Sequence, residues 1–531
     1  MGRYRRSRAW PYALVVPVLW LFPLFACGST TTDSPEPELP PSAASSSAPP
    51  GDASASDAPA PPSDAGLDAS DASSAPKLVS VGHDREIRGV WVASVFNLDW
   101  PSRAGLPMAD AKRELSALLD TFVAIGANVV NLQVRPESDA FYLSTLEPFS
   151  RFLTGTQGND PGWDPLRYAL DEAHARGLEL HAWLNPFRAA TSRTAVLAPT
   201  HIASRHPELA HPYGSSVTMD PGSPIVRDHL VAVVRDLLTR YDVDGVIFDD
   251  YFYPYPIAGT PFPDDDTYAD YLDGGGTLSK SDFRRANVND VVHAVNTVIT
   301  SVRPSVRFGV SPFGIYRPGM PPGVVGLDAY EALAADALAW LRRGDVDYLG
   351  PQLYWTTTSS GQPFGPLLDW WAGQTTTAER WLVPSIDITK IGTPGWDQAE
   401  MRAQFAALRA GRARGVRGTD LYAARTLRND TGGIATLIRT EVWPTPALPP
   451  PLATARTAVF APPTVRVDPG AVQLSHTQPS GLGFAVYGAP GRLVRWVRAR
   501  AASIVLDRGT WAISSIDERG VESLGVEVQI P

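Results

Sequence analysis

The most constraining feature of this sequence is a repeated alternation of short apolar runs with helix-like segments between residues 85 and 443. Helical spacing is clear in 109–125, where Leu115, Leu118, Leu119 and Phe122 fall on one face, and a further helix is expected at 330–343. Eight units of this kind in about 340 residues predict an α/β fold of the (β/α)8 TIM barrel type. A doubly wound sheet is the alternative, but its glycine-rich turn after the first strand is absent. The expected strands are 88–94, 128–136, 178–187, 244–254, 307–314, 347–355, 381–388 and 417–425.

A second unit is expected after the barrel, which we place at 84–443. Residues 444–463 are rich in proline and predict a semi-rigid linker. Residues 464–531 show short alternating runs separated by turn residues, a pattern that predicts a small β-sandwich. Within it, Trp511–Ser523 resembles the last strands of a fibronectin type III domain. Carbohydrate binding and simple spacing are both open roles for this module.

The N-terminus has the pattern of an export signal. A basic stretch with Arg3, Arg5, Arg6 and Arg8 precedes an apolar run that ends Leu24-Phe25-Ala26-Cys27. This ending resembles a bacterial lipobox, and Cys27 is the only cysteine of the chain. We therefore expect 1–27 to be a lipoprotein signal peptide and Cys27 to carry a lipid that anchors an exported protein in the cell envelope. The outer membrane is favoured if the cell is Gram-negative, and a simple cleaved signal is the alternative.

The segment 28–77 predicts a disordered linker. Its composition is almost entirely Ser, Ala, Pro, Asp, Gly and Thr, with few residues that can form a core.

Composition excludes several function classes. A single cysteine excludes a disulfide scaffold and a thiolate zinc site. No glycine-rich phosphate loop is present, so no nucleotide cofactor is expected. The net charge of −10 and the lack of a basic run argue against nucleic-acid binding. The run Asp264-Asp265-Asp266 does not match a calcium loop and is expected to be a solvated loop, so no metal is expected either. We also expect a monomer.

Polar and aromatic side chains cluster where the predicted strands end. Active sites of (β/α)8 barrels lie at the carboxyl ends of the strands, so these residues are candidates for a concave sugar site. The candidates are Gln133, Arg135, Glu137 and Asp139 after the second strand, His181, Trp183, Asn185 and Arg188 on the third, Asp249, Asp250 and Tyr251 after the fourth, and Gln352, Tyr354 and Trp355 after the sixth.

Seven segments resemble, in order, the bacterial glycoside-hydrolase-like family 10 over roughly residues 84–440. The resemblance implies a (β/α)8 hydrolase that acts on carbohydrate, often as an envelope lipoprotein. For a divisome-localised member of the family, the implied substrate is peptidoglycan glycan stripped of its stem peptides. The segments are Glu86–Ser102, Gln133–Asp139, Asp160–Asp164 with His181–Arg188, Asp242–Pro254, Arg284–Asn289, Phe308–Tyr316 and Asp347–Trp355.

Hydrolysis of a glycosidic bond usually needs two carboxyl groups that flank it. We expect Asp249 to be the principal carboxylate and Asp250 to be its neighbour or a sugar ligand, because successive side chains of a strand point to opposite faces. Glu137 is the first candidate for the second catalytic carboxylate, with Asp139 and Asp387 behind it. The alternatives are structural roles: a loop cap for one of Asp249 and Asp250, and an ion pair with Arg135 for Glu137.

The remaining candidates are assigned to substrate binding. Gln133, Arg135, His181, Asn185 and Arg188 have the chemistry of hydroxyl and acetamido ligands, and Tyr251, Trp183, Tyr354 and Trp355 can stack on sugar rings. Three functions stay open at this point: a hydrolase of cell-wall glycan strands, a catalytically inactive barrel that binds glycan, and a hydrolase of another extracellular polysaccharide.

Overall fold

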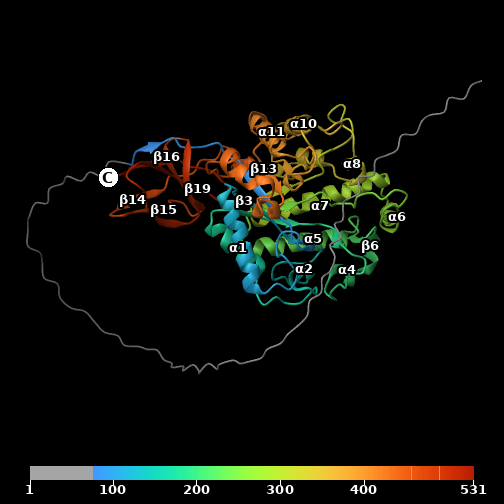
Figure 1. The fold of residues 1–531 in the computed structure, drawn as a ribbon. Coiled ribbons are helices and arrows are strands. Elements are labelled where there is room, and N and C mark those ends of the chain that lie inside the picture. Colours follow the sequence, from blue (N-terminus) through green and yellow to red (C-terminus); the bar gives the residue numbers. More distant parts are fainter. Residues whose placement is uncertain (1–75, 456, 490) are drawn as a thin grey trace, which may run out of the picture. The chain divides into compact units, whose positions relative to one another are not determined.

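The computed structural model describes residues 76–455, 457–489 and 491–531. The predictions for 1–27, for most of 28–77 and for Cys27 therefore lie outside the described residues. The main body is a curled parallel sheet with helices around it, as Figure 1 shows. The sheet order is β11-β10-β9-β8-β4-β3-β2-β13-β12. Its strands are β2 (Ile87–Val92), β3 (Val129–Arg135), β4 (Glu179–Leu184), β8 (Gly245–Phe248), β9 (Arg307–Val310), β10 (Tyr348–Leu349), β11 (Trp381–Leu382), β12 (Ser385–Asp387) and β13 (Gly418–Tyr422).

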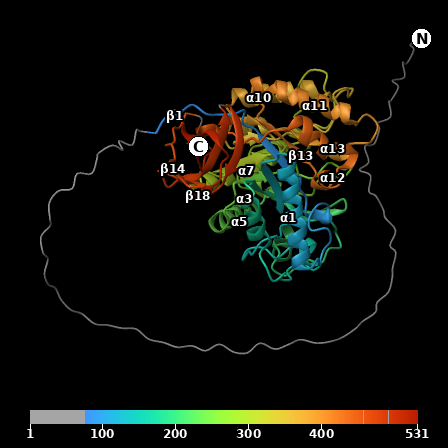
Figure 2. The same cartoon turned by 60° about the vertical axis from the view of Figure 1, so that its left-hand side comes forward.

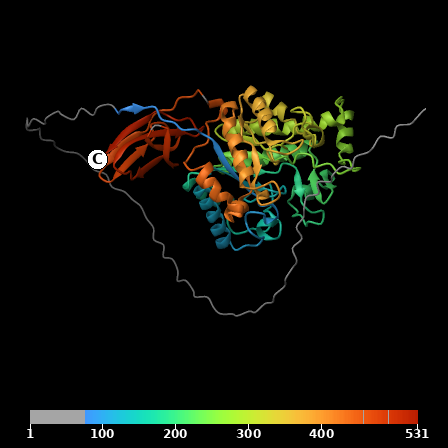
Figure 3. The ribbon, with the colours of Figure 1, turned by 45° about the horizontal axis from the view of Figure 1, so that its top comes forward.

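The two ends of this sheet meet in one segment. β11 pairs with β10 and β12 pairs with β13, although β11 and β12 are separated only by Val383 and Pro384. The predicted strand 381–388 is thus present in two pieces, because proline cannot donate a hydrogen bond to a ladder. Pro351 shortens the predicted strand 347–355 to β10 for the same reason. Strand β2 pairs in parallel with β13, and the view in Figure 3 shows β2, in blue, running into the main body of the molecule.

The helices cover the sheet because each buries an apolar face against it. Strands β2 and β3 are buried along their whole length, as expected when a parallel sheet is covered on both faces. Polar N-caps begin several helices; Asp164 accepts from the Arg167 N–H and Asp397 from the Glu400 N–H. The helices are α1 (Met108–Ala124), α2 (Arg151–Thr154), α3 (Pro165–Ala175), α4 (Ile202–Arg205), α5 (Pro224–Arg240), α6 (Asp265–Asp273), α7 (Lys280–Val302), α8 (Ala329–Ala332), α9 (Ala337–Arg343), α10 (Phe364–Thr377), α11 (Gln398–Ala410), α12 (Ala424–Arg428) and α13 (Ile434–Leu437).

Three local features differ from the prediction. The expected helix 330–343 is two helices, because Ala334 has a φ of 53° and Asp336 caps a new start. Asp264 is not in a solvated loop: it is buried, pairs with Arg284 and precedes α6. A small antiparallel sheet follows β4, in the order β5 (Arg188–Ala190), β7 (Ser216–Met219), β6 (Ala210–Tyr213).

The C-terminal region is built of antiparallel strands, as predicted. One sheet has the order β1-β20-β19-β16-β17 and the other β14-β15-β18, and a shared buried cluster that includes Phe484, Ile504 and Ile513 lies between them. Strand β1 (Leu78–Val79) comes from the N-terminal side of the chain and pairs with β20; Figure 2 shows β1, in blue, beside the red strands of this region. The remaining strands are β14 (Thr464–Asp468), β15 (Ala471–Ser475), β16 (Gly481–Ala489), β17 (Arg492–Val497), β18 (Ala501–Ile504), β19 (Gly509–Asp517) and β20 (Gly525–Ile530). The fibronectin type III identity stays a prediction.

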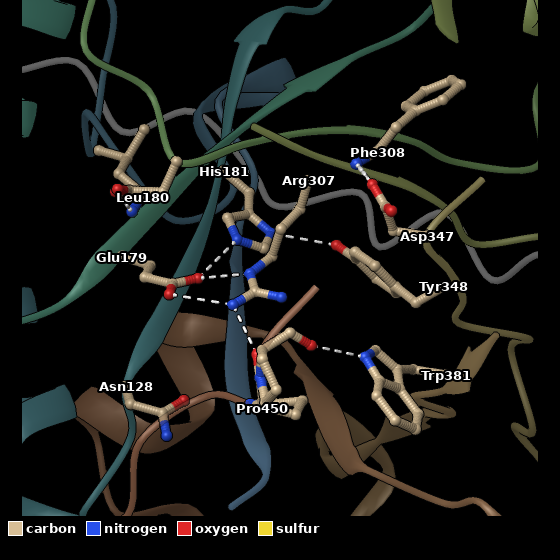
Figure 4. Close-up of polar contacts among 12 residues, drawn as sticks. Asn128, Glu179, Leu180, His181, Arg307, Phe308, Asp347, Tyr348, Trp381 and Pro450 are labelled. Atoms are coloured by element: carbon tan, nitrogen blue, oxygen red, sulfur yellow. Dashed lines mark hydrogen bonds and ion pairs between the residues drawn. The ribbon is translucent and has the colours of Figure 1, made fainter. Parts of the chain in front are cut away.

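The proline-rich segment 444–463 does not behave as a free spacer. Its carbonyl oxygens at Pro450 and Pro451 accept hydrogen bonds from Arg307 (2.7 Å) and from the Trp381 indole (2.9 Å), and Leu448 and Leu452 are buried. Arg307 and Trp381 begin strands β9 and β11, so this segment covers the amino-terminal end of the sheet (Figure 4). The linker is therefore a packed part of the fold.

The same end of the sheet holds a buried ion pair between Arg307 and Glu179 (3.1 Å). Burial opposes the charge of Glu179, but Arg307 and the hydrogen bond with His181 together outweigh it, so the pKa of Glu179 lies below its ordinary value. No helix in the part of the chain that the structure describes is long and apolar enough to cross a membrane.

We expect Arg307→Met to lower the free energy of unfolding by about 3–5 kcal/mol, because it leaves the ionised Glu179 buried without its partner. Urea unfolding followed by circular dichroism measures this. Arg402→Met is the matched control, since it breaks the exposed Arg402–Glu441 pair and should leave the unfolding midpoint in place. Equal unfolding midpoints for the two variants would show that the Arg307–Glu179 ion pair does not stabilise this end of the sheet.

Candidate active site

A cavity of about 290 Å³ opens at the carboxyl ends of the parallel strands. Seven of its fifteen lining residues are aromatic, and Asp249 and Asp250 are its acidic residues. An aromatic wall with a few convergent polar groups is typical of a small-molecule or sugar site. The lining residues are Trp91, Val95, Phe96, Leu98, Gln133, Trp183, Arg188, Asp249, Asp250, Tyr251, Tyr255, Ser311, Gln352, Tyr354 and Tyr422.

Asp249 is held as a hydrogen-bond acceptor. Its Oδ2 accepts from the Trp183 indole N–H (3.1 Å) and from the Asn185 amide, and its Oδ1 accepts from the Tyr251 backbone N–H (3.2 Å). Burial raises the pKa of Asp249, while Arg188 and these donors oppose that shift. Because the indole and the backbone N–H can only donate, the site is built around the carboxylate form of Asp249.

Asn185 is the junction that fixes this arrangement. Its Oδ1 accepts from Gln133 Nε2 (2.6 Å) and from Arg188 Nη2 (2.5 Å), so its NH₂ group must point at Asp249. Gln133 is fixed in turn, because its Oε1 accepts the backbone N–H groups of Ser94 (3.0 Å) and Val95 (2.9 Å). The orientation of the Asp249 carboxylate is therefore set by residues from β2, β3 and β4.

Asp250 has a different environment from its neighbour. Its Oδ2 accepts from the Tyr255 hydroxyl and its Oδ1 from Gln352 Nε2 (3.0 Å). Burial, together with the negative charge of Asp249, raises the pKa of Asp250 to about 6. A carboxyl group whose pKa is raised toward neutral pH next to an ionised one has the properties of a general acid.

The two carboxyl groups share the cavity, contrary to the expectation that they point to opposite faces. Strand β8 ends at Phe248, so the alternation of side chains no longer applies to Asp249 and Asp250. Of the other predicted ligands, Gln133, Trp183, Arg188, Tyr251, Gln352 and Tyr354 also line this cavity. Asn185 does not line the cavity, but it donates a hydrogen bond to Asp249, which does.

Glu137 is not brought to the cavity. Its carboxylate pairs with Arg151 (2.7 Å) and accepts the Thr191 N–H, and these contacts lower its pKa despite its burial. The structure thus gives Glu137 the contacts of a structural ion pair. Asp139 lies beside it, bonded to Gln157 (3.0 Å), and burial and Glu137 raise its pKa to about 7. Neither residue lines the cavity.

Four more predicted ligands have partners elsewhere. Arg135 is buried and paired with Glu147 (2.6 Å). His181 lies deeper in the sheet, between Tyr348 (3.0 Å) and Glu179 (3.3 Å), and Figure 4 shows these side chains pointing toward one another. Trp355 packs edge-on against Phe313, and Asp387 caps the turn at 388–390 by accepting from Thr389. Direct substrate binding by these four is not supported by their contacts.

Several lining residues were missed by the sequence analysis. Phe96, which is 60% exposed, follows the end of β2, and Tyr422 ends β13 and stacks on Tyr354 with ring centres 6.2 Å apart. Both follow the rule that site residues lie at carboxyl ends of strands, and applying it to the first and eighth strands would have found them. Tyr255 lies beyond any strand, and nothing in the pattern pointed to it. Among the described residues, no group of three or more His, Cys, Asp or Glu side chains is arranged to hold a metal ion.

Comparison with known proteins places this site in a family. The model described as glycosyl hydrolase-like 10 matches residues 86–402. The chain belongs to this family. It is 38% identical over 388 residues to glycosyl hydrolase YngK of Bacillus subtilis strain 168, covering 71% of this chain and 76% of YngK. It is 35% identical over 344 residues to glycosyl hydrolase DigH of Escherichia coli K12, covering 61% of this chain and 78% of DigH. The chain is a glycoside hydrolase.

Solved structures of low sequence identity also align with this member of the glycosyl hydrolase-like 10 family. The glycoside hydrolase domain of PgaB (BpsB) from Bordetella bronchiseptica aligns with 66% of this chain and 98% of its own length, at 12% identity and a TM-score of 0.45. The catalytic domain of β-amylase from Paenibacillus polymyxa aligns with 68% of this chain and 98% of its own length, at 14% identity and a TM-score of 0.45.

We expect kcat/KM on a cleavable glycan to fall about tenfold per pH unit above pH 6, because Asp250 then loses the proton it must donate. The Tyr255 hydrogen bond lowers the pKa of Asp250, so Tyr255→Phe should raise this pKa and move the alkaline limb to higher pH. Tyr251→Phe is the matched control and should leave the position of the limb unchanged. A limb that stays in place in Tyr255→Phe would show that another group is the acid.

Proposed function

We propose that this protein is an envelope lipoprotein that cleaves glycosidic bonds in cell-wall glycan strands of the peptidoglycan type. The observation that carries the catalytic part is the pair Asp249 and Asp250, buried side by side in an aromatic cavity with unlike hydrogen-bond partners. Asp250 is the proton donor and Asp249 stabilises the charge that develops on the sugar.

The cavity is suited to binding one sugar unit of an unbranched polysaccharide strand. Tyr251 and Tyr255 stand at its rim and are 43% and 36% exposed, so their rings are accessible to a passing strand. The Arg188 guanidinium lies over the Tyr251 ring, 5.3 Å from its centre, which keeps one face of this platform in place.

The substrate test uses two preparations: intact cell-wall sacculi and glycan strands from which the stem peptides have been removed. We expect purified protein to release fragments, detected by mass spectrometry, from the stripped strands, and Asp249→Asn to reduce the rate at least 100-fold because the charge near the reacting sugar is lost.

Asp369→Asn is the matched control for this experiment. It makes the same chemical change at Asp369 of α10, which forms an exposed ion pair with Arg414. This variant should cleave at the wild-type rate. Binding of strands without cleavage would favour a glycan-binding role. Neither binding nor cleavage would argue for a different extracellular polysaccharide.

The lipid anchor is tested separately, in cells. We expect Cys27→Ala to abolish incorporation of labelled palmitate and to shift the protein from the membrane fraction to the soluble fraction, since the thiol that would carry the lipid is absent. Cys27 is the only cysteine, so the label has no other thiol to attach to. Unchanged labelling in this variant would contradict the proposal, and fractionation of Gram-negative membranes would test the outer-membrane location.

A further inference from the structure

The acidic side chains of the cavity wall come from the end of a single strand. Of the described residues, Asp249 and Asp250 are the only acidic side chains that line it, and they are consecutive residues after the same strand. Standard glycoside hydrolases instead place two carboxyl groups on either side of the bond, about 5–5.5 Å apart in retaining and about 6.5–9.5 Å in inverting enzymes. A carboxylate on the far side of the sugar is therefore missing from the wall of this cavity.

Two other carboxylates near this end of the sheet, those of Glu137 and Asp387, are bound to other partners. Glu137 is held by Arg151 and the Thr191 N–H, and Asp387 accepts from Thr389 and lies 3.6 Å from Lys390. To act as a nucleophile, either group would have to leave these contacts and enter a cavity that it does not line.

Asp249 keeps acceptor capacity that the protein does not use. An ionised carboxylate offers about four acceptor positions, and the three donors Trp183, Asn185 and Tyr251 fill three of them. Oδ1 accepts only one of these donors, so an acceptor position remains on a group that lines the cavity. It suits an amide N–H of a bound sugar.

We propose that the substrate supplies the nucleophile through the carbonyl oxygen of its own 2-acetamido group, which makes the substrate class β-linked N-acetylhexosaminides. This inference rests on the proposed function and deepens it. In a β-linked sugar of gluco configuration, the 2-acetamido group is trans to the leaving oxygen and can attack C1 from the opposite face. Trp91 and Trp183, packed edge to face with ring centres 4.9 Å apart, provide an apolar wall for the acetamido methyl group.

The first step breaks one bond and forms another. The protonated Asp250 gives its proton to the glycosidic oxygen, and the C1–O bond breaks with its electron pair going to that oxygen. The acetamido carbonyl oxygen donates an electron pair to C1 and closes a five-membered oxazoline ring. Asp249 accepts the hydrogen bond of the amide N–H and stabilises the positive charge that develops there.

The second step restores both the sugar and the enzyme. A water molecule attacks C1 from the side that the leaving group vacated, and its proton passes to the Asp250 carboxylate. The C1–O bond of the oxazoline breaks, its electron pair returns to the acetamido group, and the product has the same anomeric configuration as the substrate. The unlike environments of the two groups support these roles, since Asp249 faces donors only, whereas the Tyr255 hydroxyl can donate to or accept from Asp250.

The test compares glycan strands that differ only in the acetamido group. Peptide-free strands are used as prepared, after chemical removal of the N-acetyl groups, and after re-acetylation with acetic anhydride. We expect the wild-type protein to cleave de-N-acetylated strands at least 100-fold more slowly and re-acetylated strands at the original rate. The new reducing ends, followed by NMR immediately after cleavage, should appear as the β anomer.

A variant and an inhibitor complete the test. Asp249→Asn should lower kcat on acetylated strands at least 100-fold, while Asp369→Asn should match the wild type. The thiazoline analogue of N-acetylglucosamine, which mimics the oxazoline, should inhibit the enzyme competitively. Equal cleavage of acetylated and de-N-acetylated strands, or initial release of the α anomer, would overturn the inference and leave the proposed function standing. No cleavage of any strand would overturn the proposed function and this inference with it.

Discussion

The end of β8 at Phe248 is the constraint on which the site depends. Two carboxyl groups follow it immediately, and the curled sheet buries both, so water cannot stabilise their charges. Their ionisation is then decided by protein dipoles. Asp249 accepts hydrogen bonds from Asn185 and Trp183, and its negative charge in turn favours the protonated form of Asp250. A single strand terminus thus yields one carboxyl group held as a carboxylate and a second whose pKa is raised to about 6.

The architecture was largely predictable, because apolar periodicity directly reports which faces are buried. All eight strand positions and the antiparallel C-terminal region agree with the structure. The errors lie where local backbone chemistry overrides the pattern. Pro351 and Pro384 interrupt ladders that the apolar runs suggested, and the positive φ of Ala334 divides an expected helix. Strand β1 was missed, since a pair of residues shows no period.

The sequence predicts which strands contribute to the site. It does not predict how deep each side chain lies in the sheet or how neighbouring strands are in register. Glu179, His181 and Trp183 alternate onto one face of β4, and each step of two residues rises by about 6.6 Å, so only Trp183 reaches the cavity. Arg135 is displaced by a register shift between β3 and β4 that follows Gln133, and it pairs with Glu147 instead. A β-bulge of this kind has no clear signature in a single sequence.

The pairing of Leu78–Val79 with β20 also determines where the folded unit begins. The Lys77–Glu527 ion pair (2.9 Å) adds to this attachment, so the three residues Lys77–Val79 are bound to the last strand of the chain. A shortened form that starts after Val81 would leave β20 as an open edge, with unpaired N–H and C=O groups facing solvent. Open edges of this kind pair with other chains, so proteolytic trimming at this point would turn a closed module into one prone to self-association.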